Sequence, residues 1–177
     1  MLSHIPTHLI AGPLGAGKTS LIRHLLAHKP ADERWAVLIN EFGQIGLDAA
    51  LLTQDDDGIA LGEVAGGCLC CVAGPQMTVT VTKMLRENRP DRLIIEASGL
   101  AHAASVIDEL NTPPLSNALT VGAVLTVVDP RQFVDPDFNL QGLYQDQIGV
   151  CDVLVASKVD LCSDEVMTQF RERSAKL

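Results

Sequence analysis

The chain has 177 residues, of which 47% are hydrophobic and 20% are charged, so it is long enough to bury a substantial core. Its formal net charge of −9, from 22 acidic and 13 basic residues, and its 3% aromatic content argue against binding to nucleic acid or anionic membranes. Five cysteines, an odd number, argue against a disulfide framework. No apolar run is long enough to cross a bilayer and the N-terminus lacks a signal-peptide pattern, so we expect a cytoplasmic protein.

The first predicted strand, residues 7–11, leads into residues 12–19, which read G-P-L-G-A-G-K-T and match the complete phosphate-binding loop. A helix is predicted over residues 20–28, where leucine and isoleucine recur at helical spacing. Glycines let backbone N–H groups close around a phosphate, Lys18 adds positive charge, and the Thr19 hydroxyl is a ligand for Mg²⁺. The loop therefore predicts a nucleotide site, with expected contacts from Gly12, Gly15, Ala16, Gly17, Lys18, Thr19 and Ser20.

Further strands are predicted over residues 35–40, 59–64, 93–97, 123–128 and 153–156, with helical patterns between several of them. This alternation predicts an α/β fold of the phosphate-loop NTPase type, in which a mostly parallel sheet carries helices on both faces. Ligands of such sheets gather at the carboxyl ends of the strands. Polar motifs follow the strands here, at residues 40–43, 96–99, 129 and 157–160. A final helix is predicted over residues 163–177.

Glu96 ends an apolar strand, which is the position of the acid that holds Mg²⁺ through water in phosphate-loop enzymes. Gly99, three residues later, is placed to donate its backbone N–H to a γ-phosphate. Asp129 also ends a strand, but we interpret it as a turn residue before Pro130. Glu41 is the candidate for positioning the attacking water. The predicted catalytic residues are therefore Lys18, Thr19, Glu41 and Glu96.

A cysteine loop at residues 66–71 reads G-G-C-L-C-C and places Cys68, Cys70 and Cys71 on a backbone that two glycines make adaptable. Three thiolates can converge on one soft cation, and zinc would take a fourth ligand from Glu41, Glu63 or a histidine. Cobalt or nickel would accept similar donors. His102, just after the Glu96 loop, is a candidate for contacting a metal or a phosphate.

The last polar motif, Ser157-Lys158-Val159-Asp160, resembles the base-reading Asn-Lys-x-Asp motif of GTP-binding proteins. The Asp160 carboxylate can accept from both N1–H and the exocyclic amine of guanine, whereas adenine lacks this pair of donors. Ser157 stands where an asparagine is expected. The loss of one or two neutral hydrogen bonds there would lower affinity by roughly tenfold without removing guanine preference.

In their order and spacing, the phosphate loop, the Asn40-Glu41-Phe42-Gly43 motif, the cysteine loop, the Glu96 loop and the Ser157 motif resemble the CobW family of metallochaperone GTPases. The resemblance covers nearly the whole chain. It implies a phosphate-loop GTPase fold that binds GTP and GDP, Mg²⁺-dependent GTP hydrolysis, and a Zn²⁺ or Co²⁺ site at the cysteine loop that serves delivery to a client metalloprotein. Members continue into a smaller C-terminal domain, so we expect residues 1–177 to form one GTPase domain that is cut short at its C-terminal end.

Our hypothesis for the mechanism is that GTP orders residues 40–41 and 96–99 and thereby shapes the metal site, while hydrolysis releases the metal. Two alternatives stay open. An ATP-dependent small-molecule kinase would use the same phosphate loop, although no arginine-rich lid is evident. A metal-buffering or regulatory module would have a weakened nucleotide site, as Ser157 hints. A homodimer is also left open.

Overall fold

The computed structural model describes residues 4–39, 58–63, 75–100, 102–139 and 142–177. Within these ranges, seven strands form one sheet, and every strand pair in it is parallel. The order is β3-β2-β4-β1-β6-β7, and β5 pairs with β1 beside this path. The strands are β1 (Ile5–Ala11), β2 (Trp35–Ile39), β3 (Ile59–Glu63), β4 (Arg92–Glu96), β5 (Leu119–Val121), β6 (Leu125–Val128) and β7 (Val153–Ala156).

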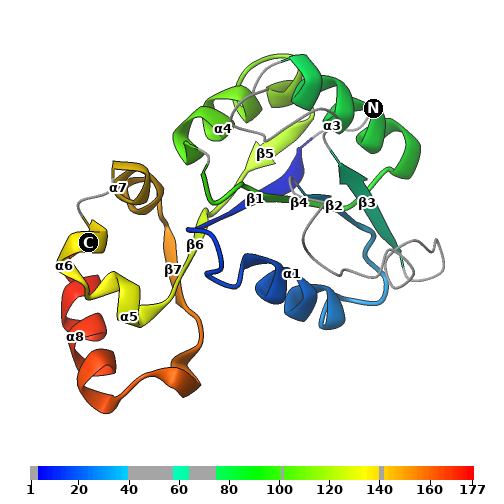
Figure 1. Cartoon of the computed structure of the whole chain (residues 1–177). Helices are drawn as coiled ribbons and strands as arrows, with labels where there is room; N and C mark the ends of the chain where they lie inside the picture. The colour runs from blue at the N-terminus through cyan, green and yellow to red at the C-terminus, as the bar shows by residue number, and fades with distance from the viewer. Residues whose placement is uncertain (1–3, 40–57, 64–74, 101, 140–141) are drawn as a thin grey trace.

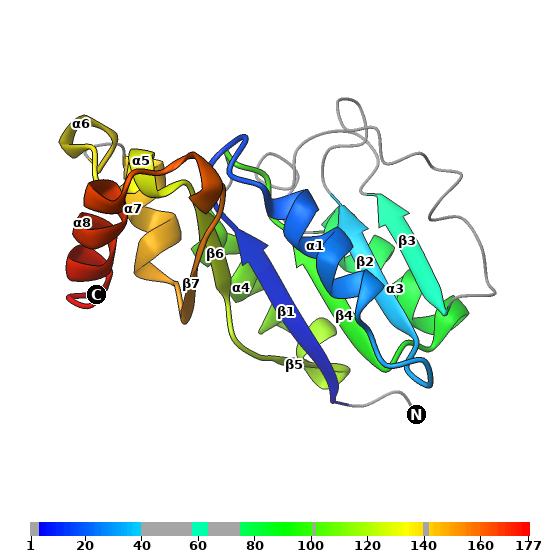
Figure 2. The same cartoon turned by 90° about the horizontal axis from the view of Figure 1, so that it is seen from below.

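Helices cover both faces of the sheet, as Figures 1 and 2 show. The helix α1 (Lys18–Ala27) lies on one face, and α3 (Pro75–Asn88) and α4 (Ala103–Leu110) lie on the other. The helices near β7 are α5 (Pro130–Phe133), α6 (Pro136–Asn139), α7 (Gly142–Gly149) and α8 (Asp164–Ser174). Two short 3-10 turns, η2 (Leu115–Asn117) and η3 (Val159–Leu161), complete the described elements. The predicted fold class is confirmed.

The core explains why the central strands read as continuous apolar runs. All five residues of β2 are buried, because helices pack on both faces of this strand. On the α1 side the core contains Ile22 and Leu26, and on the α3 and α4 side it contains Met77 and Val106. Among the described residues, every helix is too short or too polar to span a lipid bilayer.

The strands that the sequence predicts are present, and their boundaries differ by at most two residues where the structure describes them. Residues 40 and 64, two predicted strand ends, lie outside the described residues. The predicted last helix forms over Asp164–Ser174, and the Ser163 hydroxyl caps it by accepting from the backbone N–H of Val166 at 3.3 Å. The strand β5 is not predicted. It has three residues, so its pairing with β1 depends on tertiary packing and leaves little pattern in the sequence.

Candidate nucleotide-binding site

The parallel sheet brings the predicted motifs to one edge because their strands end there. Glu96 is the last residue of β4, and it lies beside Ile10 of β1. The phosphate loop follows β1 directly, and Ser157 follows β7, where its backbone N–H donates to the Val128 carbonyl at 2.9 Å. Three motifs that are far apart in the chain therefore lie along one edge of the sheet, at the carboxyl ends of β4, β1 and β7.

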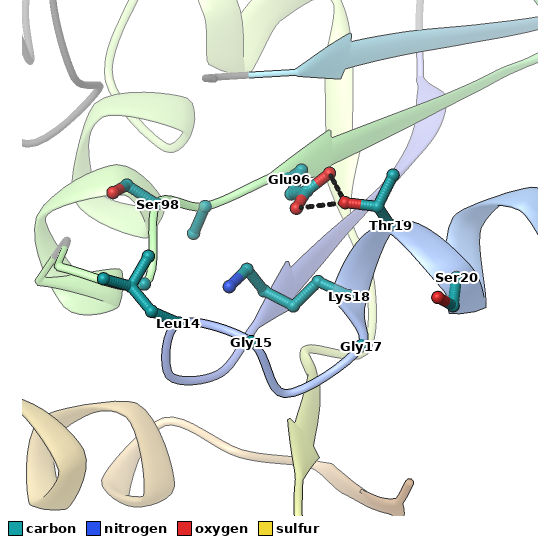
Figure 3. Close-up of a pocket in the computed structure, with 10 residues that line it drawn as sticks. Leu14, Gly15, Gly17, Lys18, Thr19, Ser20, Glu96 and Ser98 are labelled. Carbon is teal, nitrogen blue, oxygen red and sulfur yellow. Dashed lines mark hydrogen bonds between the residues drawn. The ribbon is translucent and has the colours of Figure 1, made fainter. Parts of the chain in front are cut away.

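A cavity of about 260 Å³ lies between the phosphate loop and the end of β4 (Figure 3). The helix α1 begins at Lys18, so its positive dipole end faces this cavity. Gly15 and Gly17 adopt positive φ angles of 70° and 99°, which let the chain turn tightly around the space. The lining residues are Leu14, Gly15, Gly17, Lys18, Thr19, Ser20, Glu96, Ala97, Ser98 and Gly99.

Gly12 begins the loop with a φ angle of 135°, at a point where the chain lies close to the backbone of β6. A Cβ atom on Gly12 would lie 2.2 Å from the carbonyl oxygen of Val127, closer than van der Waals contact allows. The glycine is therefore needed both for its backbone conformation and for the close approach of two strands.

Gly12→Ala is therefore expected to destabilise the fold by about 3 kcal/mol or more, because backbone strain adds to a clash with an immovable carbonyl. Thermal unfolding measures this as a fall in Tm of roughly 6–12 °C. Gly15→Ala is the matched control, since a Cβ there meets nothing within 4 Å. It carries only the cost of the left-handed backbone, about 1–2 kcal/mol. Equal losses of stability in the two variants would contradict the close-approach argument.

Lys18 places a buried positive charge inside the loop. The residue is 7% exposed, and its Nζ donates to the carbonyl oxygens of Gly12 at 2.9 Å and Pro13 at 3.1 Å. Figure 3 shows the side chain of Lys18 extending across the cavity, between the phosphate loop and the end of β4. The ammonium is thus held where an anionic ligand in the cavity would meet it.

Thr19 and Glu96 form a buried pair at the base of the cavity. The Thr19 hydroxyl donates to both carboxylate oxygens of Glu96, at 3.0 and 3.2 Å, and the residues are 8% and 6% exposed (Figure 3). Hydroxyl and carboxylate oxygens are the hard ligands that Mg²⁺ takes in nucleotide enzymes. The donor set therefore fits a magnesium ion. The competing acid Asp129 does not line this cavity.

Gly99 packs directly against the phosphate loop. A Cβ on Gly99 would lie 2.5 Å from the backbone nitrogen of Leu14, so the two loops meet at this point. The carbonyl of Gly99 accepts a hydrogen bond from Nε2 of Gln147 at 3.2 Å. Leu14, Ala97 and Ser98 line the cavity, and like Gln147 they were not predicted as site residues. No local sequence motif could have indicated the contact between Gln147 and Gly99, because 48 residues separate them in the chain.

The predicted base-reading loop lies next to the phosphate loop. A Cβ on Gly17 would lie 3.5 Å from the Cβ of Ser157, and the Ser157 hydroxyl donates to the Val128 carbonyl at 3.1 Å. Lys158 adopts a left-handed backbone with a φ angle of 51°, and Asp160 is exposed in η3. The Nζ of Lys158 lies 3.7 Å from a carboxylate oxygen of Asp129.

Asp129 is a buried carboxylate beside this loop that binds Arg131 and lies close to Lys158. It caps α5 by accepting from the backbone N–H of Arg131, and the Arg131 guanidinium binds both carboxylate oxygens, at 3.0 and 2.6 Å. These hydrogen bonds hold the pKa of the Asp129 carboxyl below its ordinary value of 3.8, against the opposing effect of burial. The sequence interpretation was a turn residue before Pro130; in the structure Asp129 is instead the N-cap of α5, and Pro130 is the first residue of that helix.

Asp129→Asn is expected to lower the free energy of unfolding at pH 7 by about 1–3 kcal/mol, through weaker bonds to Arg131 and Lys158. Because folding depresses the pKa of this carboxyl, its contribution is present above pH 3.8 and is lost as pH falls through the folded value. The gap between variant and wild type should therefore shrink below about pH 4. Urea unfolding from pH 7 to pH 3 measures it, with the exposed Asp32→Asn as control. A gap that is constant with pH would contradict the charge argument.

Some predicted residues lie elsewhere or outside the described ranges. His102 does not line the cavity. It precedes α4, and its Nδ1 lies 2.5 Å from a carboxylate oxygen of Asp146 on α7. Glu41, Cys68, Cys70 and Cys71 fall outside the described residues. In the ranges that are described, no group of three metal-ligating side chains comes together.

Two relatives named zinc chaperones align with most of this chain. YeiR of Escherichia coli (strain K12) is 45% identical over 159 residues, which cover 90% of this chain and 48% of YeiR. CobW of a Sinorhizobium sp is 38% identical over 198 residues, with coverage of 95% and 54%. The chain thus spans about half the length of the curated relatives that it matches.

Solved structures show the same fold. A zinc-bound triple mutant of the GTPase YjiA superposes with a TM-score of 0.67 at 24% identity, covering 93% of this chain and 52% of that one. HypB from Archaeoglobus fulgidus gives a TM-score of 0.59 at 17% identity, covering 96% and 74%. Residues 6–177 match the model of the CobW/HypB/UreG nucleotide-binding domain. With this match and a complete phosphate loop around a cavity of the expected kind, the chain belongs to the CobW/HypB/UreG family.

Proposed function

We propose that the chain is the GTP-binding and GTP-hydrolysing domain of a metallochaperone that binds zinc or a similar transition metal and delivers it to a client protein. The observation that carries this proposal is the buried Thr19–Glu96 pair, which lies with Lys18 at the base of the phosphate loop. The zinc-chaperone relatives support the metal part of the proposal. Residues 1–177 would act as one GTPase domain in the cytoplasm, where nucleoside triphosphate is supplied.

In GTP hydrolysis, Lys18 and the backbone N–H groups of residues 15–18 would stabilise the charge that spreads over the transferring phosphoryl group. Thr19 and Glu96, whose side-chain oxygens already lie together in the cavity, would hold Mg²⁺. When bound, this ion supplies positive charge that neutralises the phosphate oxygens. Glu41 remains the proposed residue for orienting the attacking water.

Cys68, Cys70 and Cys71, with Glu41 as a fourth ligand, are the proposed metal site. In the sequence the cysteine loop lies between residues 40–41 and 96–99, the two segments expected to sense the γ-phosphate. Ordering of both segments by GTP would shape the metal site, and hydrolysis would release the metal. If GTP tightens zinc binding, zinc must tighten GTP binding by the same factor.

Guanine selection is proposed to rest on Asp160, which is exposed at the base-reading loop. The Ser157 hydroxyl donates to the carbonyl of Val128, so it strengthens the loop's attachment to β6. Two alternatives are tested with the same assay. An ATP-dependent kinase would prefer adenine nucleotide, and a metal buffer would bind zinc but no nucleotide.

A calorimetric titration of Mg²⁺-GTP and Mg²⁺-ATP, each with and without one equivalent of zinc, tests the proposal. We expect guanine preference and an affinity for GTP that rises with zinc. Zinc affinity that is identical with GDP and with a non-hydrolysable GTP analogue would overturn the coupling. Preference for ATP, or zinc binding without nucleotide binding, would favour the corresponding alternative.

A further inference from the structure

Gln147 is a residue of α7 whose polar side chain is buried against the loop that follows β4. The residue is 1% exposed, and its Nε2 donates to the carbonyl oxygen of Gly99 at 3.2 Å. Its own backbone carbonyl accepts from the hydroxyl of Thr126, a fully buried residue of β6, at 3.0 Å. The amide that reaches Gly99 is therefore anchored to the sheet through its main chain.

Gly99 is held from two sides. On one side it packs against the backbone of Leu14 in the phosphate loop, where a Cβ would come within 2.5 Å. On the other side, Nε2 of Gln147 holds the carbonyl oxygen of Gly99 itself. The next backbone N–H, that of Leu100, donates to the Ser98 hydroxyl at 3.3 Å. Ser98 and Gly99 both line the cavity, so the position of this loop sets the shape of one wall.

We infer that Gln147 is a positioning residue, which holds the Gly99 loop where it can meet a γ-phosphate and so sets the preference for triphosphate over diphosphate. The inference rests on the proposed function. A buried amide is costly unless it is hydrogen-bonded, so its placement at this carbonyl ties the conformation of the loop to α7. The α7 helix also contacts α4, which begins directly after the loop, and Asp146 of α7 lies beside His102 there.

The direct test compares Gln147→Met with Gln145→Met. Both change a glutamine of α7 to methionine. Gln145, however, is exposed, and it lines a second cavity between α7 and α8 that is separate from the phosphate-loop cavity. The dissociation constants of GDP and of a non-hydrolysable GTP analogue are measured with Mg²⁺, and Tm is recorded. We expect Gln147→Met to weaken the analogue about two- to tenfold, the effect of one neutral hydrogen bond, while GDP affinity stays unchanged. Gln145→Met should change neither.

A merely structural role predicts a different pattern, in which Tm falls and both nucleotides weaken equally. That pattern, or an unchanged preference in Gln147→Met, would overturn the inference while the wild type still discriminates between the nucleotides. A wild-type chain that bound neither guanine nucleotide would overturn the proposed function, and this inference with it. The two failures are therefore distinguishable.

Hydrogen exchange of the wild type provides a measurement that does not depend on a folded variant. Peptides covering Gly142–Gly149 should gain protection with the GTP analogue relative to GDP, together with residues 96–100. Exchange in α7 that is the same in both complexes would contradict coupling between Gln147 and the γ-phosphate.

Discussion

Replacing Lys18 by methionine is expected to lower GTP hydrolysis by about a hundred- to a thousandfold. The physical reason is that Lys18, a residue that is 7% exposed, has its ammonium fixed by the Gly12 and Pro13 carbonyls. The charge therefore needs little reorganisation when negative charge develops on the phosphoryl group. Methionine keeps a similar length and apolar stem but removes the ammonium. Single-turnover hydrolysis of GTP measures the loss.

Lys83→Met provides the matched control for this experiment. Lys83 lies on α3 with a side chain that is 72% exposed, and its pair with Glu87 at 4.0 Å is a surface interaction that contributes little. Its hydrolysis rate and Tm should equal those of the wild type. If Lys18→Met retained full hydrolysis, the phosphate loop would not be the catalytic site, and the proposed GTPase activity would have to be placed elsewhere.

The parts of the site that the sequence predicts are those that depend on one local motif and one topological rule. The phosphate loop is contiguous from Gly12 to Thr19, and parallel strands end at a common edge, so Glu96 was expected near Thr19. The structure places their side-chain oxygens 3.0 Å apart. The backbone conformation of the phosphate loop also follows from the sequence, because glycines occupy its three positions with a positive φ angle.

The remaining contacts depend on how distant helices pack, which the sequence pattern does not reveal. Gln147 reads as an ordinary helical glutamine, and its burial becomes visible only when α7 lies against α4 and β6. His102 was a candidate for contacting a metal or a phosphate, but it does not line the cavity, and its ring lies beside Asp146 of α7. The position of Lys158 beside Asp129 likewise requires β6 and β7 to be adjacent.

Glu96→Gln is expected to raise the Mg²⁺ concentration needed for tight GTP binding by about 10- to 100-fold, which is typical when a residue that supports a metal through its outer shell is changed. The glutamine oxygen can still accept from the Thr19 hydroxyl, so the contact that now joins α1 to β4 is kept and Tm should change little. What disappears is the negative charge. The experiment therefore separates a role in holding the ion from a role in holding the fold.

The measurement is GTP affinity as a function of Mg²⁺ concentration, with Glu87→Gln as the control. Glu87 has a side chain that is 60% exposed on α3, so the same loss of one negative charge there should leave the Mg²⁺ dependence unchanged. If Glu96→Gln also left it unchanged, the carboxylate would serve only as the partner of Thr19. The magnesium site would then rest on Thr19 and the nucleotide itself, because Asp129, the acid that follows β6, is bound by Arg131 and does not line the cavity.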